Sequence, residues 1–182
     1  MDEMSQWLSP AEQHAWRSFL RMQEKLAARL GRELLTQSKL SPADYGVLVE
    51  LTDTPDGRRR LQDLAKALER EQSRMSHHIA RMTKRGLVTR EECADDGRGV
   101  LVVITPAGRA AIEAAAPHHV DTVRRLFIDR LTPEELGTLT RISDRIVAEL
   151  EREPADQADP SVNGSAAAQA AGRQRAPRRP KP

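Results

Sequence analysis

Residues 72–90, QSRMSHHIARMTKRGLVTR, combine two adjacent histidines, five cations and two methionines in one short stretch. Such a set permits three kinds of chemistry: metal binding, an electrostatic interaction face, and contacts to the phosphates and base edges of a nucleic acid. Adjacent side chains diverge by about 100° on a helix, whereas two histidines that share a metal lie four residues apart. The spacing of His77 and His78, and of His118 and His119, therefore disfavours a metal site.

Helical spacing gives this stretch two different faces. Met75, Ile79 and Met82 fall on one side and predict a buried stripe. The other side carries hydrogen-bonding and cationic side chains, which suit base edges and phosphates. The candidate contact residues on that side are Ser73, Arg74, His77, Arg81 and Lys84.

The composition is that of a charged, helix-rich chain with one cysteine. Of its 182 residues, 38% are hydrophobic and 31% charged, and the net charge is only +2. Residues 56–90 nevertheless hold ten Lys or Arg against four acids, which favours a polyanionic partner. A lone Cys93 excludes an internal disulfide framework and fits a reducing cytoplasm. We see no signal peptide and no apolar run of membrane-spanning length, so we expect a cytoplasmic protein without a membrane partner.

Four Ser-Pro or Thr-Pro pairs predict the beginnings of helices. SPAE (9–12), SPAD (41–44), TPAG (105–108) and TPEE (132–135) each place a hydroxyl at the N-cap and proline at the first helical position. Apolar spacing carries the first helix to about residue 37 and the second to the DTPDG turn. The fifth helix is expected to run to about residue 130, with a kink at Pro117, and a sixth follows it. Residues 153–182 are predicted to be disordered because they hold almost no large apolar side chain.

Between the second and fifth helices the pattern predicts a winged helix-turn-helix. A short helix at 61–68, a tight turn and the helix ending at Gly86 come first. Two β-prone runs, LVTREEC and VLVVIT, follow and are separated by the turn-forming ADDGRG. The fold class is thus mainly α with a small β-hairpin wing. Arg98 at the wing tip suits a narrow minor groove, and Asp96 can hold its guanidinium in position.

Several segments together resemble the MarR family of bacterial transcription regulators. They are LSPADYGVLVEL, LQDLAKAL, SRMSHHIARMTKRGLVTR, DDGRG and LVVITPAGRAAI. The resemblance implies a homodimer that binds double-stranded DNA. It adds Ser76 to the groove-facing set and makes Asp96 and Arg98 the wing pair. It divides the chain into an N-terminal dimerisation helix (1–37), a winged helix-turn-helix lobe (38–104), C-terminal dimerisation helices (105–152) and a disordered basic tail (153–182).

Three places depart from the family pattern, and one of them is the tail beyond residue 153, which has no family counterpart. Glu69 and Arg70 stand where the family usually has glycine followed by an apolar residue. His78 stands where the family usually has an apolar residue, and we expect it to be a packed, partly buried histidine.

The family resemblance also implies a small aromatic or phenolic acid as effector, and no cofactor. An arginine can pair with a carboxylate while an indole stacks on the ring, which makes His14, Trp16, Arg17 and Tyr45 the candidate ligand residues. The alternative is that Trp16 anchors an interface and Arg17 is a surface charge.

The sequence therefore predicts a ligand-responsive DNA-binding regulator, in the first place a repressor that recognises a pseudo-palindromic operator. Two alternatives are a metal- or redox-sensing regulator and a module that binds an acidic protein through the basic helix. Acids beside Cys93 oppose the thiolate that a redox sensor needs. No phosphate-binding glycine loop, nucleophile elbow or HExxH motif is present, so we do not expect an enzyme.

Overall fold

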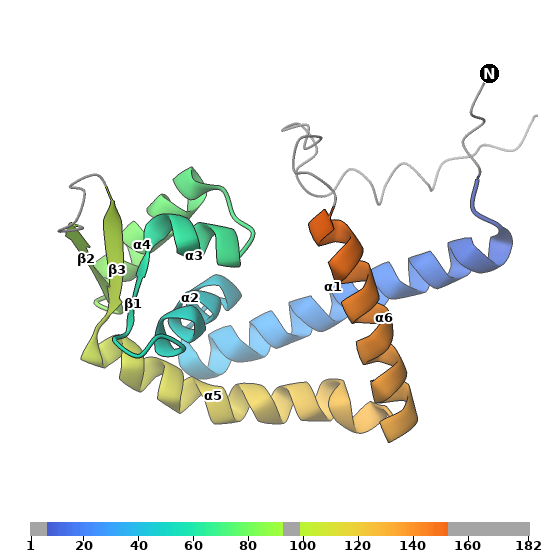
Figure 1. Cartoon of the computed structure of the whole chain (residues 1–182). Helices are drawn as coiled ribbons and strands as arrows, with labels where there is room; N and C mark the ends of the chain where they lie inside the picture. Colours follow the sequence, from blue (N-terminus) through green and yellow to red (C-terminus); the bar gives the residue numbers. More distant parts are fainter. Residues whose placement is uncertain (1–6, 93–98, 153–182) are drawn as a thin grey trace, which may run out of the picture. The chain divides into compact units, whose positions relative to one another are not determined.

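The computed structural model describes residues 7–92 and 99–152, which form mainly helices with one small sheet (Figure 1). The elements in chain order are α1 (Pro10–Ser38), α2 (Pro42–Thr52), β1 (Arg58–Arg60), α3 (Leu61–Ala67), α4 (Gln72–Lys84), β2 (Val88–Glu92), β3 (Val100–Ile104), α5 (Pro106–Leu126), the 3-10 turn η1 (Ile128–Arg130) and α6 (Pro133–Arg152). The predicted tail lies outside the described residues, as do Cys93, Asp96 and Arg98.

All four predicted helix starts are confirmed. The α1 and α2 helices begin with complete capping boxes, in which Ser9 pairs with Glu12 and Ser41 with Asp44. At the start of α5 the Thr105 hydroxyl accepts the Gly108 N–H. The α6 helix begins at Pro133, inside the TPEE motif.

The wing is a three-stranded antiparallel sheet with the order β1-β3-β2. Strands β2 and β3 form the predicted hairpin, with Val88 opposite Ile104 and Glu92 opposite Val100. The third strand, β1, consists of three arginines and pairs with the other edge of β3. The sequence did not predict β1 because three consecutive cations carry no strand pattern.

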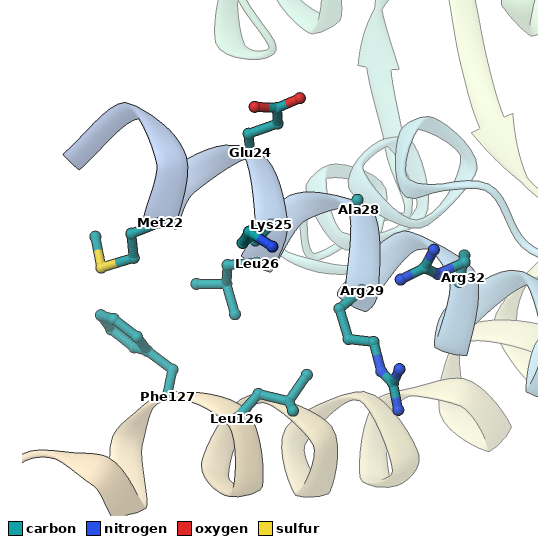
Figure 2. A pocket seen from close by; sticks show the side chains of 9 residues that line it. All are labelled: Met22, Glu24, Lys25, Leu26, Ala28, Arg29, Arg32, Leu126 and Phe127. Atoms are coloured by element: carbon teal, nitrogen blue, oxygen red, sulfur yellow. The ribbon is translucent and has the colours of Figure 1, made fainter. Parts of the chain in front are cut away.

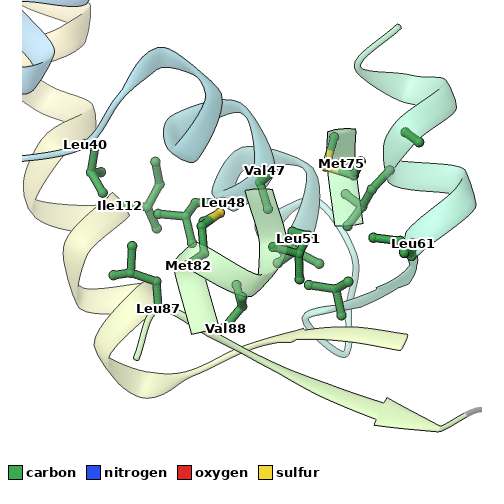
Figure 3. Packing of buried hydrophobic residues seen from close by; sticks show 14 of the residues in the cluster. Leu40, Val47, Leu48, Leu51, Leu61, Met75, Met82, Leu87, Val88 and Ile112 are labelled. Atoms are coloured by element: carbon green, nitrogen blue, oxygen red, sulfur yellow. The ribbon is translucent and has the colours of Figure 1, made fainter. Parts of the chain in front are cut away.

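One apolar core joins the wing to the helices. Figure 3 shows side chains from α2, α4 and β2 meeting Ile112 of α5. Leu48, Met75, Ile79, Met82 and Val88 have no exposed surface. The predicted buried stripe of α4 is therefore confirmed, and it fixes which side of the helix remains outside.

The α1 helix packs lengthwise against α5, and α2 packs at the C-terminal end of α1 (Figure 1). The α5 helix continues through Pro117 but ends at Leu126, four residues earlier than expected, where η1 follows. Gly31 meets the Pro42 ring at the crossing of α1 and α2.

The chain divides into two compact units, and α6 belongs to the second, which begins at Pro133. None of the residues of α6 is buried, although its apolar side chains recur at helical spacing. In the described ranges, no helix is both long and apolar enough to cross a membrane.

Candidate nucleic-acid interface

The turn between α3 and α4 sets the angle between two short packed helices. Glu69 adopts a left-handed conformation with φ 48°, although it is not glycine. The Arg70 N–H reaches back 2.8 Å to the Ala65 carbonyl and closes the end of α3. The turn therefore keeps the backbone geometry that glycine would give, at a cost of about 1–2 kcal/mol for an L-residue in this region.

The exposed side of α4 carries the residues that the sequence selected. We call this set the groove face: Ser73, Arg74, Ser76, His77, Arg81 and Lys84. Ser76 is half-buried and the other five are exposed. The opposite stripe is fully buried, so the helix cannot rotate about its axis without exposing its core side chains. The structure thus gathers these six predicted residues on one helix surface.

The wing-tip residues Asp96 and Arg98 lie outside the described residues, and their role stays a prediction. At the base of the wing, Arg58 pairs with Asp56 and with Glu91, at 3.3 and 3.4 Å. Arg59 pairs with Glu50 of α2. Intrachain carboxylates therefore engage both arginines.

A buried polar cluster at the junction of α1, α2 and α4 was not predicted. Its centre is Asp44, which is 3% exposed. Arg85 donates from Nη1 to Asp44 Oδ2 at 2.7 Å and from Nη2 to the Lys39 carbonyl at 2.6 Å. His78 Nε2 lies 3.2 Å from Asp44 Oδ1. Arg85 thus ties the end of α4 to α1 and α2.

The cluster sets the charge states of its members. Burial raises the pKa of Asp44, but the Ser41 N–H and the Arg85 guanidinium lower it by more, and the net pKa lies below 3.8. Burial lowers the pKa of His78 below 6.5; nearby arginines lower it further, and Asp44 opposes them. Near neutral pH the cluster therefore holds an ionised Asp44 beside a neutral His78. The capping motif predicts that Asp44 caps a helix. The sequence near Asp44 does not predict its distant partners, Arg85 and His78.

Thr105 and Gly108 fix the wing to α5. The Thr105 hydroxyl donates to the Gly86 and Leu87 carbonyls, at 2.6 and 3.0 Å, and accepts from Gly108 N–H. A Cβ on Gly108 would lie 2.0 Å from the Leu87 carbonyl oxygen. The Thr-x-x-Gly motif thus lets the first turn of α5 touch the backbone that leads into β2.

The predicted ligand residues do not come together within one chain. His14, Trp16 and Arg17 lie exposed on α1, where Trp16 stacks on Phe19. Tyr45 lies on α2, near the far end of α1, about six helical turns away. Its ring contacts His119 of α5 at 4.6 Å, and burial raises the pKa of Tyr45 and lowers that of His119.

A groove of about 810 Å³ lies between α1 and the C-terminal end of α5 (Figure 2). Its apolar side is formed by Leu26, Leu126 and Phe127, and Figure 2 shows these side chains between the two helices. Arg29 and Arg32 bring positive charge to one end of it. The sequence did not single out this groove. We call it the α1–α5 groove.

Among residues 7–92 and 99–152, no group of three His, Cys, Asp or Glu side chains could hold a metal ion. His77 is exposed and His78 faces Asp44, so the two adjacent histidines diverge as their spacing predicted.

Taken together, a two-helix motif, a second helix with a cationic outer face and an adjacent antiparallel wing define a winged helix-turn-helix DNA-binding protein. Residues 38–99 match the model of the MarR family.

Solved structures agree. The chain is 40% identical to AbsC, a MarR family transcriptional regulator from Streptomyces coelicolor, with a TM-score of 0.77 over 81% of this chain and 99% of that one. It is 39% identical to Sco3205 from the same organism, solved in complex with DNA, with a TM-score of 0.79 over 85% and 96%. It is 26% identical to Bordetella bronchiseptica BpsR, whose DNA binding is regulated by 6-hydroxynicotinic acid, with a TM-score of 0.64 over 74% and 98%. The chain therefore belongs to the MarR family of transcriptional regulators.

Proposed function

We propose that this protein is a cytoplasmic, non-enzymatic repressor that binds a pseudo-palindromic operator as a homodimer and responds to a small aromatic acid. In this proposal α4 enters the major groove with the groove face toward the bases, and Arg98 at the wing tip enters the neighbouring minor groove. Two copies on a two-fold axis would read half-sites about 10 base pairs apart.

The observation that carries the DNA-binding proposal is the division of α4 into two faces. Met75, Ile79 and Met82 are fully buried, and five of the six groove-face residues are exposed. Arginine, histidine and serine are side chains that hydrogen-bond to base edges in the major groove. A merely solvated helix surface would not need arginine and histidine gathered on the side opposite the core.

Exposed apolar side chains support the homodimer. Trp16 and Phe19 on α1 are about half exposed, and Leu150 on α6 is 64% exposed. Apolar rows of this kind are stable when another surface covers them. A second copy would cover both in a closed, two-fold arrangement. The divisions 1–37, 38–104 and 105–152 then act as dimerisation helix, reading lobe and dimerisation helices, with the basic tail 153–182 outside.

Selection of duplexes from a random pool tests the function as a whole. We expect recovery of an inverted repeat, with binding that weakens steeply as salt rises. Recovery of no preferred sequence, or binding that is insensitive to salt, would contradict the proposal. Salt-sensitive binding to an acidic protein but not to DNA would favour the interaction-module alternative.

Arg74→Ala and Lys84→Ala form a matched pair, because each removes one cation from the same helix. We expect Arg74→Ala to weaken binding to the selected duplex by about 1–3 kcal/mol and to relax the preference at one position. Lys84→Ala should weaken binding to all duplexes alike and reduce the salt slope by about one. Arg98→Ala should also lower the salt slope. If Arg74→Ala leaves the base preference intact, the groove face is not the surface that contacts the bases.

The effector part of the proposal draws on charge and stacking. The Arg17 guanidinium can pair with a carboxylate, and the indole of the neighbouring Trp16 can stack on an aromatic ring. Arg29 lines the apolar α1–α5 groove. BpsR offers the parallel, since its DNA binding is regulated by an aromatic acid. Titration with hydroxylated benzoic and nicotinic acids should change tryptophan fluorescence and release DNA. If the ligand changes the tryptophan fluorescence of Trp16→Phe as much as that of the wild-type protein, Trp16 does not contact the ligand.

A further inference from the structure

His78 lies on α4 at the boundary between the buried stripe and the groove face. Its side chain is buried, with 7% of the residue exposed. Its two ring nitrogens face opposite partners: Nε2 lies 3.2 Å from Asp44 Oδ1, and Nδ1 lies 3.1 Å from Arg81 Nη2. His78 therefore connects a buried carboxylate to a residue of the groove face.

These contacts select one form of the imidazole ring. A guanidinium only donates hydrogen bonds, so Nδ1 must accept from Arg81 and cannot carry a proton. The proton of the neutral ring then resides on Nε2, next to the ionised Asp44. The Nε2 atom is buried and poorly aligned for a full hydrogen bond, so its attraction to Asp44 is mainly electrostatic.

We propose that His78 is a positioning residue for DNA recognition, which holds the Arg81 guanidinium at the edge of the groove face through Nδ1, in the tautomer that Asp44 stabilises. The inference rests on the proposed role of α4 in the major groove. Arginine has five N–H donors, and this contact uses one of them. No other partner of the Arg81 side chain is seen among the described residues, so the other donors can reach a base or a phosphate. A side chain that is already ordered loses less entropy on binding.

Protonation of the His78 ring would break its contact with Arg81. A proton on Nδ1 sets two donors against each other and releases Arg81. The charged groups around the ring are Asp44 on α2, Arg70 in the turn before α4, Arg81 on α4 and Arg85 directly after its end. Burial opposes the protonated ring most strongly, Asp44 favours it and the three arginines oppose it. The pKa of His78 is therefore lowered, and the contact with Arg81 is lost only when acidification protonates the ring.

A double-mutant cycle on DNA binding tests the proposal. The measured quantity is the preference for the selected duplex over a random duplex, for the whole protein. We expect His78→Leu to lower this preference by about 2- to 10-fold, the range that ordering one long side chain represents. The same change should have little effect when Arg81 is already alanine. Arg74 lies two turns from Arg81, so Arg74→Ala should combine with Arg81→Ala additively and serves as the control.

The conservative variant and the pH profile separate positioning from packing. The amide oxygen of His78→Gln can accept from Arg81 but cannot gain a proton, so this variant should retain most of the preference at pH 7. As the pH is lowered from 7.5 through the titration of His78, which the NMR signals of the ring report, the preference of the wild-type protein should fall, and that of His78→Gln should stay level. If His78 only packs in the core, the effects of His78→Leu and Arg81→Ala should add, and the wild-type protein and His78→Gln should have identical pH profiles. Either result overturns the inference.

If His78→Leu does not fold, the nitrogen NMR signals of the wild-type ring still decide. A proton on Nδ1 at pH 7 overturns the inference, and a proton on Nε2 supports it. A wild-type protein without any sequence preference would instead refute the proposed function, which the random-pool selection detects separately.

Discussion

The DNA-binding lobe and α6 are both built from amphipathic helices, yet they complete their packing in different ways. In the lobe, Met75, Ile79 and Met82 of α4 disappear fully into a core shared with α2, β2 and α5. In α6 the apolar positions recur at equally regular spacing, but none of its residues is buried. The same periodic signal therefore marks a finished core in one place and an uncovered surface in the other.

The difference teaches that periodicity predicts a face and not its partner. The lobe surrounds α4 with elements of the same chain, so its stability should not depend on protein concentration. Within residues 133–152, the described part of its unit, nothing covers the apolar row of α6, so its stabilisation should come from a bimolecular contact and follow mass action.

Gly108→Ala should have the largest effect. The added methyl group would lie 2.0 Å from the Leu87 carbonyl oxygen, which is backbone and cannot rotate away. We expect a loss of at least about 3 kcal/mol in the free energy of unfolding, or failure to fold. Denaturant unfolding measures it. A loss below 1 kcal/mol would show that α5 and the wing are not in contact as described.

Met82→Ala and Leu150→Ala compare equivalent losses of apolar surface. Met82 is fully buried, so we expect its truncation to cost about 2–5 kcal/mol at any protein concentration. Leu150→Ala should cost less than about 0.5 kcal/mol in dilute protein and more as the concentration rises. Unfolding at two concentrations distinguishes these cases. If both variants lose the same free energy of unfolding at both concentrations, the lobe and α6 do not differ in how they are stabilised.

Acidification should weaken the lobe and its contact with α5, because burial lowers the pKa values of His78 and His119 below 6.5. In this range the unfolded chain binds more protons than the folded chain, so the free energy of unfolding falls as the pH drops. The slope is at most about 1.4 kcal/mol per pH unit for each histidine. The α6 helix contains no histidine. Unfolding between pH 7.5 and 5 checks the sign, and a rise in stability would contradict the described burial.

Gly137→Ala should have the smallest effect and the opposite sign. Nothing lies within 4 Å of the position of the added methyl group on α6. Alanine favours a helix over glycine by about 1 kcal/mol, so the amides of α6 should exchange more slowly with solvent. Faster exchange would show that Gly137 touches a partner surface, and this would locate the second copy.

Several features of the fold could be predicted because their causes are local. The Ser9 and Ser41 caps involve residues three positions apart, so SPAE and SPAD fix the starts of α1 and α2 within a single turn. The buried stripe of α4 follows from helical spacing alone. In contrast, β1 could not be predicted, because Arg58–Arg60 become a strand only when the edge of β3 offers them backbone partners.

The candidate site divides along the same line. The sequence by itself determined which side of α4 is polar, since a helix of known period has only one way to bury Met75, Ile79 and Met82. Only the tertiary structure decided which cations remain available for a partner. Arg85 joins Asp44 across 41 positions, and Arg59 joins Glu50 from another element. Local sequence does not encode such pairs, because the charges meet only after the core has brought their helices and strands together.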